Sequence, residues 1–401
     1  MLPNKSTKKI IFYFEYMGAL GGVANQWIAI FEELSKRNVP FIFFNFEGSD
    51  MMKIIKKKGI KNFPLVDIDN FDWNTLPDLV TEEDVMVITS FDHFLYRFLK
   101  VNPKIIYYNL SQYIGQISGY KYGLNFKKLG GKLIKLLDEK NAFAPMDGGR
   151  KNESYTELGY QAKFYHFLPI TVDRISSNLY VKNNGKKLVC CYIGRSVDWK
   201  MIPLKRILKD FLLTETPVVF HIIVSSYKEM LNHIPLQEFS RKNIEFIIKE
   251  NLPIEELNDY LKNTHIDIGF GMGTSVLDFA KLGIPSIVVD YGKKDFPDNY
   301  KYVWLADTEE YNLGDDMDKH LQNNPKRISL QHIVSNITTD DNYLKKKSDE
   351  TWEYINREHS KESTVDKLCN IAEKTEFRLQ MAQKYVPYFW KAHNLLKNIS
   401  R

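Results

Sequence analysis

Residues 264–290 read THIDIGFGMGTSVLDFAKLGIPSIVVD, and this stretch contains the strongest fold signal in the chain. Its apolar run at 266–270 predicts a strand, residues 271–275 form a turn of glycines and hydroxyl side chains, and a short helix follows. Gly283 is suited to end that helix because glycine adopts a left-handed backbone without steric cost. The apolar residues 284–289 predict a second strand, so the stretch is a βαβ unit with its glycine turn at the start of the helix.

The glycine turn is a candidate anion site, because the first N–H groups of a helix are unpaired and the helix dipole adds positive charge there. An ordinary βα turn would explain an isolated glycine turn equally well. Asp278, one turn inside the helix, favours a ligand, since a carboxylate beside a diphosphate can accept hydrogen bonds from ribose hydroxyls, worth about 1.5–3 kcal/mol each. We interpret the site as one for a nucleotide diphosphate carrying a further group, with these donor-binding residues: Gly271, Met272, Gly273, Thr274 and Ser275.

The bulk composition bounds the class of protein. A chain of 401 residues exceeds a typical single core, so two domains of ordinary size are expected. Hydrophobic residues make up 44% and aromatic residues 13% of the sequence, which is typical of a well-packed globular protein. The net charge of +5 is modest for this length, so we expect no nucleic-acid partner, while anionic ligands and membrane surfaces stay open.

The cysteines and the N-terminus bear on the compartment. Cys190, Cys191 and Cys369 show neither a metal spacing nor a disulfide framework, as is typical of a reducing compartment. The first apolar run is interrupted by Glu15 and lacks the cleavage site of a secretory signal. No stretch reaches the ~20 apolar residues of a membrane span. We therefore expect a cytoplasmic protein without a metal site.

Near-continuous apolar strands separated by helices occur in two series along the chain. The strands are expected at 9–14, 40–44, 63–68, 85–89 and 104–108, and then at 188–193, 218–224, 244–248, 266–270 and 284–289. Such strands belong to parallel sheets covered on both faces. The polar segment 182–187 is a good linker between the two series.

The fold class predicted is therefore α/β, with two tandem Rossmann-like, doubly wound domains. The expected bounds are 1–181 for the first domain, 182–345 for the second, and 346–401 for C-terminal helices that pack back across the domains to the first one. Within this last part, 376–399 has the pattern of a long amphipathic helix that is interrupted at Pro387. Pro203 and Pro253 are each expected at the first residue of a helix, a position that proline favours.

Three segments carry a family resemblance: Tyr192–Lys200 (YIGRSVDWK), Phe167–Asp173 (FLPITVD) and Leu277–Pro285 (LDFAKLGIP). With the two-domain organisation, they resemble the GT-B glycosyltransferases, and more closely the retaining family called glycosyltransferase family four. The first is similar to that family's strand, Gly-Arg and Lys signature. The second resembles its Pro-Asn-Gly-Val-Asp segment, and the third its Leu-Glu-Ala-x-Ala-x-Gly-x-Pro segment.

The resemblance implies roles for individual residues. Arg195 and Lys200 would bind the donor diphosphate and act in catalysis, beside Gly194 at the strand end. The chemistry agrees, since Arg offers a planar fork and Lys a compact charge to phosphate oxygens, and fixed cations lower the barrier for a departing diphosphate. Either residue alone would be interpreted as a solvated loop charge. The family's later Glu corresponds to Asp278, which is the third residue expected to act in catalysis. The family's earlier Glu would fall at Phe270, which cannot hydrogen-bond.

The first domain offers a weaker site. His93 follows the fourth strand, where the family often places a His near the donor sugar. We expect it to be the fourth catalytic residue, and Asp92 could orient it. A structural or exposed loop histidine is the alternative interpretation. Gly21 and Gly22 lie at the end of the first strand, where α/β proteins bind ligands, and are predicted to contact the donor. Their loop does not fit the Gly-x-Gly-x-x-Gly pattern, so no nicotinamide or flavin cofactor is expected.

Residues 126–137 are basic and amphipathic, and such a segment can lie on an anionic membrane surface. The alternative is an ordinary surface helix with a buried apolar stripe. Contact with the inner face of the plasma membrane would suit a lipid-linked acceptor.

The function predicted is transfer of a hexose-type sugar from a UDP- or GDP-type nucleotide-sugar donor to a glycan or lipid-linked acceptor hydroxyl. The resemblance implies a retaining, metal-independent enzyme without a cofactor, in synthesis of a bacterial surface polysaccharide such as capsule or lipopolysaccharide. Two alternatives are a nucleotide-sugar epimerase of the same build and a catalytically silent nucleotide-sugar-binding partner. The residue Phe270 in place of the earlier Glu favours the silent protein.

Overall fold

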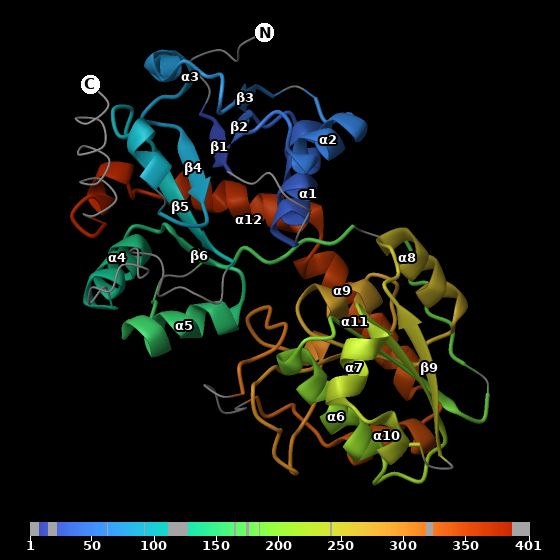
Figure 1. Cartoon of the computed structure of the whole chain (residues 1–401). Helices are drawn as coiled ribbons and strands as arrows, with labels where there is room; N and C mark the ends of the chain where they lie inside the picture. The colour runs from blue at the N-terminus through green and yellow to red at the C-terminus, as the bar shows by residue number, and fades with distance from the viewer. Residues whose placement is uncertain are drawn as a thin grey trace. The chain divides into compact units, whose positions relative to one another are not determined.

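The computed structural model describes residues 8–14, 22–61, 63–91, 93–110, 127–163, 166–173, 176–183, 185–240, 243–317 and 324–386. The chain forms two compact units, the first of Met1–Thr171 with Lys361–Arg401 and the second of Val172–Ser360. Each unit is built on a six-stranded, mainly parallel sheet with helices around it (Figure 1). The predicted α/β class with two Rossmann-like units is therefore confirmed.

The sheet of the first unit has the strand order β3-β2-β1-β4-β5-β6, and all of its pairs are parallel. Its strands are β1 Ile10–Tyr13, β2 Phe41–Asn45, β3 Leu65–Asp67, β4 Val85–Ile88, β5 Lys104–Asn109 and β6 Phe143–Pro145. The chain adds strands on one side of β1 and then returns to the other side at β4. Because the strand order reverses there, the crevice outside the carboxyl ends of β1 and β4 is this unit's topological switch point.

Side chains alternate between two cores on the two faces of this sheet, as the two-residue period of a strand requires. Ile10 and Phe12 enter the core that contains α1 and α12, and Ile11 enters the opposite core with residues of α4 and of 377–386. The helices and 3-10 turns of this unit are α1 Gly22–Lys36, α2 Asp50–Lys57, η1 Trp73–Thr75, α3 Leu76–Leu79, η2 His93–Phe98, α4 Lys127–Glu139, α5 Gly148–Leu158, α12 Lys361–Lys374 and η7 Leu379–Ala382. Helix α12 packs against α1, as Figure 1 shows within the first unit, so the chain returns to this unit at Lys361.

The prediction of a long helix that begins at Glu376 is wrong for the part that the structure describes. Residues 375–378 after α12 are not helical, with an antiparallel bridge between Lys104 and Arg378 and a hydrogen bond of 2.7 Å from the Ile105 N–H to the Phe377 carbonyl, and the 3-10 helix η7 follows. Phe377 and Leu379 are fully buried in the first unit's core. Pairing with the start of β5 thus overrides the local helical pattern, and residues 387–401 lie outside the described part.

The second unit has the strand order β12-β11-β10-β7-β8-β9, and only the β11–β12 pair is antiparallel. Its strands are β7 Leu188–Gly194, β8 Val218–Val224, β9 Ile244–Glu250, β10 Ile268–Gly271, β11 Ser286–Val288 and β12 Val303–Trp304. Its helices and 3-10 turns are α6 Asp198–Phe211, α7 Tyr227–His233, η5 Leu236–Glu238, α8 Ile254–Asn263, α9 Thr274–Ala280, η6 Leu305–Asp307, α10 Leu330–Thr339 and α11 Tyr343–Glu358. Here the strand order reverses between β7 and β10.

The units divide at Val172, whereas the sequence places the boundary at 182, and α11 belongs to the second unit and not to the returning segment 346–401. The residues before the polar linker belong with the second unit because they pack on it. The side-chain amide of Asn178 donates to the Ser348 hydroxyl (2.8 Å) and to the Asp349 carboxylate (2.9 Å), and Tyr180 packs against the second unit's core.

Helix boundaries follow the sequence signals in part. Gly283 has a φ of +78° after α9, as expected for the residue that ends that helix. Pro253 is the N-cap of α8, next to its predicted position. The prediction for Pro203 is wrong, since α6 already begins at Asp198 and contains Pro203 in its interior. The Val197 carbonyl starts α6 earlier by accepting the N–H groups of the third and fourth helical residues.

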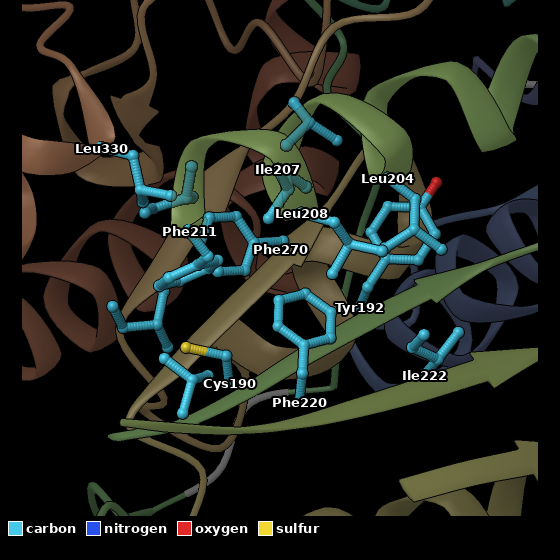
Figure 2. Close-up of a cluster of buried hydrophobic side chains, with 14 of the residues drawn as sticks. Cys190, Tyr192, Leu204, Ile207, Leu208, Phe211, Phe220, Ile222, Phe270 and Leu330 are labelled. Atoms are coloured by element: carbon cyan, nitrogen blue, oxygen red, sulfur yellow. The ribbon is translucent and has the colours of Figure 1, made fainter. Parts of the chain in front are cut away.

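Phe270 lies in the hydrophobic core of the second unit. Its side chain is fully buried on β10 and contacts the rings of Phe211, Phe220 and Tyr302 at 6.1–6.2 Å between centroids (Figure 2). The position that corresponds to the family's earlier Glu therefore faces the core in this chain. The absence of a carboxylate there removes no contact from the carboxyl edge of the sheet.

We predict that Phe270→Glu lowers the free energy of unfolding by at least about 4 kcal/mol, because it buries a carboxylate among aromatic rings without a partner. Phe270→Leu keeps an apolar side chain and is expected to cost clearly less. Urea denaturation of the three proteins measures both values. A Phe270→Glu protein of wild-type stability would show that this side chain does not face the core.

Candidate functional site

The candidate site lies at the switch point of the second unit. In a doubly wound sheet, ligands bind outside the carboxyl ends of the strands where the strand order reverses. In this unit those strands are β7 and β10, which are hydrogen-bonded neighbours. The loop 195–197 after β7 and the turn 272–273 after β10 therefore leave the sheet side by side. Nine of the eleven predicted donor-binding residues lie in the surrounding segments 194–200 and 271–278.

The first wall of the site is the turn from β7 into α6. A Cβ on Gly194 would lie 2.7 Å from the Tyr192 ring, so the glycine leaves room for that ring at the strand end. The Tyr192 hydroxyl donates to the Lys200 carbonyl at 2.6 Å, which ties the first turn of α6 to the strand. The Ser196 hydroxyl accepts from the Ser226 N–H (2.9 Å) and donates to the Ser226 carbonyl (2.6 Å). These bonds fix the loop that carries the basic residues.

Arg195 and Lys200 flank the ring of Trp199. The Arg195 guanidinium carbon lies 5.9 Å and the Lys200 Nζ 5.3 Å from the ring centroid, within the range of cation–π contacts. The ring also meets Tyr291, which follows β11, edge-on at 5.7 Å. Sequence analysis did not single out Trp199 or Tyr291, although Trp199 stands between the two basic residues in the motif.

Lys200 is held in an environment that disfavours its charge. Burial, with the neighbouring Arg195 charge as the second cause, lowers the pKa of Lys200 to about 8. Among the described residues, no carboxylate forms an ion pair with Arg195 or Lys200. Two adjacent cations without an anionic partner repel each other, so a bound anion would relieve a cost that the protein bears alone.

The second wall is the glycine turn from β10 into α9. Gly273 has a φ of +59°, and its N–H donates to the Leu313 carbonyl at 2.8 Å. A Cβ on Gly271 would lie 2.7 Å from the Val276 nitrogen, so this glycine allows the helix to approach the strand. The Ser275 hydroxyl closes the turn by accepting from the N–H of Met272 (3.2 Å) and donating to its carbonyl (2.8 Å).

These bonds reduce the number of N–H groups in the glycine turn that can bind an anion. The Met272 and Gly273 N–H groups and the Ser275 hydroxyl are engaged within the protein, whereas Thr274 is exposed at the start of α9 and no side chain caps this helix. With seven residues, α9 is short and contributes a small dipole. The basic pair is therefore the larger source of positive charge at this edge.

Asp278 does not stand alone on α9. Its carboxylate pairs with the Lys281 Nζ at 2.7 Å, and the two side chains are 21% and 14% exposed. A ribose that used this carboxylate would share it with Lys281. The predicted ribose contact stays a prediction, with Lys281 as an additional residue to test.

The site residues predicted in the first unit come after β1 and β4, the strands at the switch point of that unit. Gly22 is the first residue of α1 and His93 the first residue of η2, so they follow β1 and β4 as expected from the sequence. Gly21 and Asp92 lie outside the described residues. The roles of Gly21, Gly22 and His93 stay predictions.

The basic segment 126–137 corresponds to α4. Its apolar residues Leu133, Ile134 and Leu137 are fully buried in the first unit, while Lys132 and Lys135 are exposed. Among the described residues, no helix has the length and apolar character to cross a bilayer. In the same part of the chain, no group of three or more His, Cys, Asp and Glu side chains is arranged to hold a metal ion.

No protein-family model matches the chain, and no curated protein is similar to it in sequence. Solved structures do match it. A glycosyltransferase from Rickettsia africae has a TM-score of 0.56 at 12% identity, over 92% of this chain and 98% of that one. HepE from Anabaena, in complex with UDP, has a TM-score of 0.55 at 10% identity, over 91% and 99%. The lipopolysaccharide outer core galactosyltransferase WaaB, in its apo form, has a TM-score of 0.53 at 14% identity, over 90% and 98%.

At these identities the similarity establishes the fold. The chain has the GT-B fold, with two Rossmann-like units, that these glycosyltransferases share. The resemblance to the GT-B enzymes is thus confirmed at the level of structure. The closer likeness to family four stays a prediction.

We predict that Lys200→Met stabilises the protein at pH 7. The pKa of about 8 in the folded state lies below the value of about 10.5 for a free lysine, so stability is lowest below pH 8 and rises between about pH 8 and 10.5. Methionine keeps the apolar stem and removes the buried charge. Thermal melts at pH 7 and at about pH 10 should show a gain at the lower pH that shrinks at the higher one.

The control for this prediction is Lys209→Met, at the other end of α6, where the side chain is 43% exposed and its Nζ lies 3.8 Å from Asp295 Oδ2. This variant should leave the melting temperature almost unchanged at both pH values. If Lys200→Met is less stable than the wild type at pH 7, the lysine has a normal pKa and an unrecognised partner.

Proposed function

We propose that this protein is a glycosyltransferase that moves a hexose-type sugar from a nucleotide diphosphate donor to an acceptor hydroxyl. The donor diphosphate binds at the switch point of the second unit, between the loop that carries Arg195 and the glycine turn before α9. The acceptor is a glycan or a lipid-linked saccharide of a bacterial surface polysaccharide. We place the reaction in the cytoplasm, with the exposed lysines of α4 as candidate contacts to an anionic membrane surface.

One observation carries the proposal: the pair of adjacent cations, Arg195 and Lys200, at the carboxyl edge of a GT-B second unit. Lys200 is desolvated, and no described carboxylate neutralises either charge. A structural lysine would be expected to pair or to extend into solvent. A dianionic diphosphate matches the charge of the two neighbouring cations, and Arg can bind two phosphate oxygens at once.

The same pair suggests how transfer would be accelerated. Negative charge grows on the leaving diphosphate as the glycosidic bond breaks, and the bonds of Tyr192 and Ser196 hold the backbone that carries Arg195 and Lys200. Preorganised cations stabilise this transition state more than the ground state, in which the glycosidic bond is intact and the diphosphate carries less charge. We include retention of anomeric configuration and independence of a metal ion in the proposal, because the family resemblance implies them.

Two of the similar structures support the substrate class. HepE was solved with UDP, and WaaB is a galactosyltransferase of the lipopolysaccharide outer core. We therefore favour a UDP-type donor and a surface-glycan acceptor for this chain. Phe270 is a core residue of the second unit, and the catalytically silent nucleotide-sugar-binding protein stays the alternative to this proposal.

We predict that Arg195→Ala, Lys200→Ala and Asp278→Ala each lower turnover by at least about a hundredfold in folded protein, since each removes a charge expected to contact the donor. A screen of melting temperature against UDP, GDP and their sugars identifies the donor first, because a true ligand stabilises by mass action. Donor consumption with an acceptor panel then measures turnover. Lys209→Ala serves as the control that changes a charge on α6 away from the site.

The outcomes separate the parts of the proposal. Wild-type turnover in all three variants would reject the site, while a wild type that no nucleotide stabilises would reject the donor class. Binding without transfer to any acceptor would support the silent protein. Asp278 either contacts the donor or only pairs with Lys281. Lys281→Met removes the ion pair and leaves the Asp278 carboxylate free, so donor affinity should stay intact if Asp278 contacts the donor.

A further inference from the structure

We propose that the buried pair of Asp290 and Arg327 is a positioning device that sets both walls of the candidate diphosphate site. It acts on the first wall through Tyr291 and Trp199, and on the second through Leu313 and Gly273. The inference rests on the proposed function for what binds at the site. The connection between the pair and the two walls is a property of the fold and can be tested without any ligand.

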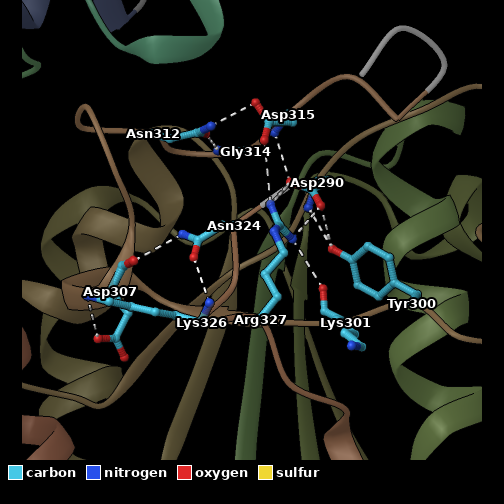
Figure 3. Close-up of polar contacts among 10 residues, drawn as sticks. All are labelled: Asp290, Tyr300, Lys301, Asp307, Asn312, Gly314, Asp315, Asn324, Lys326 and Arg327. Atoms are coloured by element: carbon cyan, nitrogen blue, oxygen red, sulfur yellow. Dashed lines mark hydrogen bonds and ion pairs between the residues drawn. The ribbon is translucent and has the colours of Figure 1, made fainter. Parts of the chain in front are cut away.

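Both carboxylate oxygens of Asp290 accept hydrogen bonds, and Arg327 Nη2 also lies 3.5 Å from Asp315 Oδ2. Arg327 donates from Nη1 to Asp290 Oδ2 (2.8 Å) and from Nη2 to Asp290 Oδ1 (3.0 Å), as Figure 3 shows. The Tyr300 hydroxyl donates to Oδ2 (3.0 Å), and the Asp315 N–H donates to Oδ1 (2.9 Å). Arg327 Nη1 also donates to the Lys301 carbonyl at 3.1 Å. One carboxylate thereby joins the end of β11, the segment 312–317 and the segment before α10.

This pair is a poor candidate for a device of stability alone. Asp290 is fully buried and Arg327 is 5% exposed, so both charges have lost their hydration. Replacing a buried ion pair by apolar residues is often neutral or stabilising. Among the described residues, the Arg327 Nε also lacks a hydrogen-bond partner, which is a further cost. What the pair does supply is a fixed direction for every backbone group bonded to it.

The route to the first wall runs through Tyr291, the residue after Asp290. Segment 312–317 pairs with it, because the Tyr291 N–H donates to the Asp315 carbonyl (2.9 Å) and the Met317 N–H donates to the Tyr291 carbonyl (2.8 Å). The backbone of Tyr291 is thus fixed from both sides. Its ring meets the Trp199 ring edge-on at 5.7 Å, and Trp199 stands between Arg195 and Lys200.

The route to the second wall runs through a tight turn. The Gly314 N–H donates to the Asn312 side-chain oxygen (2.7 Å), and the Asn312 amide donates to the Asp315 carboxylate (2.7 Å). Gly314 has a φ of +126°, and a Cβ there would lie 2.7 Å from the Val289 carbonyl oxygen, so only glycine fits. The turn presents the Leu313 carbonyl to the Gly273 N–H at 2.8 Å, which holds the glycine turn in its left-handed conformation.

The test compares wild type with Arg327→Met, which keeps the side-chain volume and removes the bidentate bond. Competitive labelling of amines, read by mass spectrometry, gives the pH at which the Lys200 amine becomes reactive, and it needs no ligand. If the pair holds Trp199 and its neighbours in place, water enters around Lys200 in the variant. Its midpoint should rise from about pH 8 by about one unit or more toward that of a free lysine.

UDP and GDP affinity, measured by calorimetry, is the second readout, with an expected loss of about tenfold in Arg327→Met. The control is Lys9→Met, which breaks an equally buried pair with Asp84 (3.6 Å) in the first unit and should move neither readout. Arg327→Lys keeps the charge and loses the fork, so its effect should be intermediate. It also serves if Arg327→Met does not fold.

An unchanged Lys200 midpoint in folded Arg327→Met and Arg327→Lys overturns the inference. Equal shifts in the Lys9→Met control also overturn it, since they would show a general loosening. A wild type that binds neither nucleotide removes the proposed function, while the labelling midpoint still decides whether the pair positions the wall.

Discussion

The second unit depends on a single electrostatic constraint, the unneutralised charge of Arg195 and Lys200 at the end of β7. A lysine whose pKa is lowered to about 8 by burial and by a neighbouring cation destabilises the fold that contains it. The surrounding structure must therefore hold these side chains in place against their own repulsion. The hydroxyl of Tyr192 on the Lys200 carbonyl, the bonds of Ser196 and the ring of Trp199 together do so.

The parts of the fold that the sequence predicts are those with local causes. Apolar runs of strand length place β7, β10 and β11, and the glycine turn after β10 and the left-handed Gly283 follow from the freedom of glycine. The switch point needs only the strand order, which the repeated strand–helix pattern implies. Arg195 and Lys200 follow the end of β7 within its turn into α6, and their roles at a site stay predictions.

The remaining features depend on contacts between distant segments. Arg327 meets Asp290 across 37 residues, and nothing near either position marks the partner. Residues 376–378 leave the helical path because they pair with the start of β5, and the 3-10 helix η7 follows them, although the local pattern predicts an α-helix. Phe270 was aligned with a Glu of the family by spacing alone, and only the packing against Phe211 and Phe220 shows that its side chain faces the core.

These observations together explain how the second unit can contain both buried charges and a stable fold. Its aromatic core, with Phe270, Phe220 and Tyr302, supplies apolar burial on one side of the sheet. The polar groups gather beyond the carboxyl ends of β7, β10 and β11, where loops and not strands meet. Asp290 and Arg327 neutralise each other there, as do Asp278 and Lys281, whereas Arg195 and Lys200 form no ion pair with a described carboxylate. Because the loops are tied by their own bonds, little free energy would be needed to reorder them around the anion that we propose.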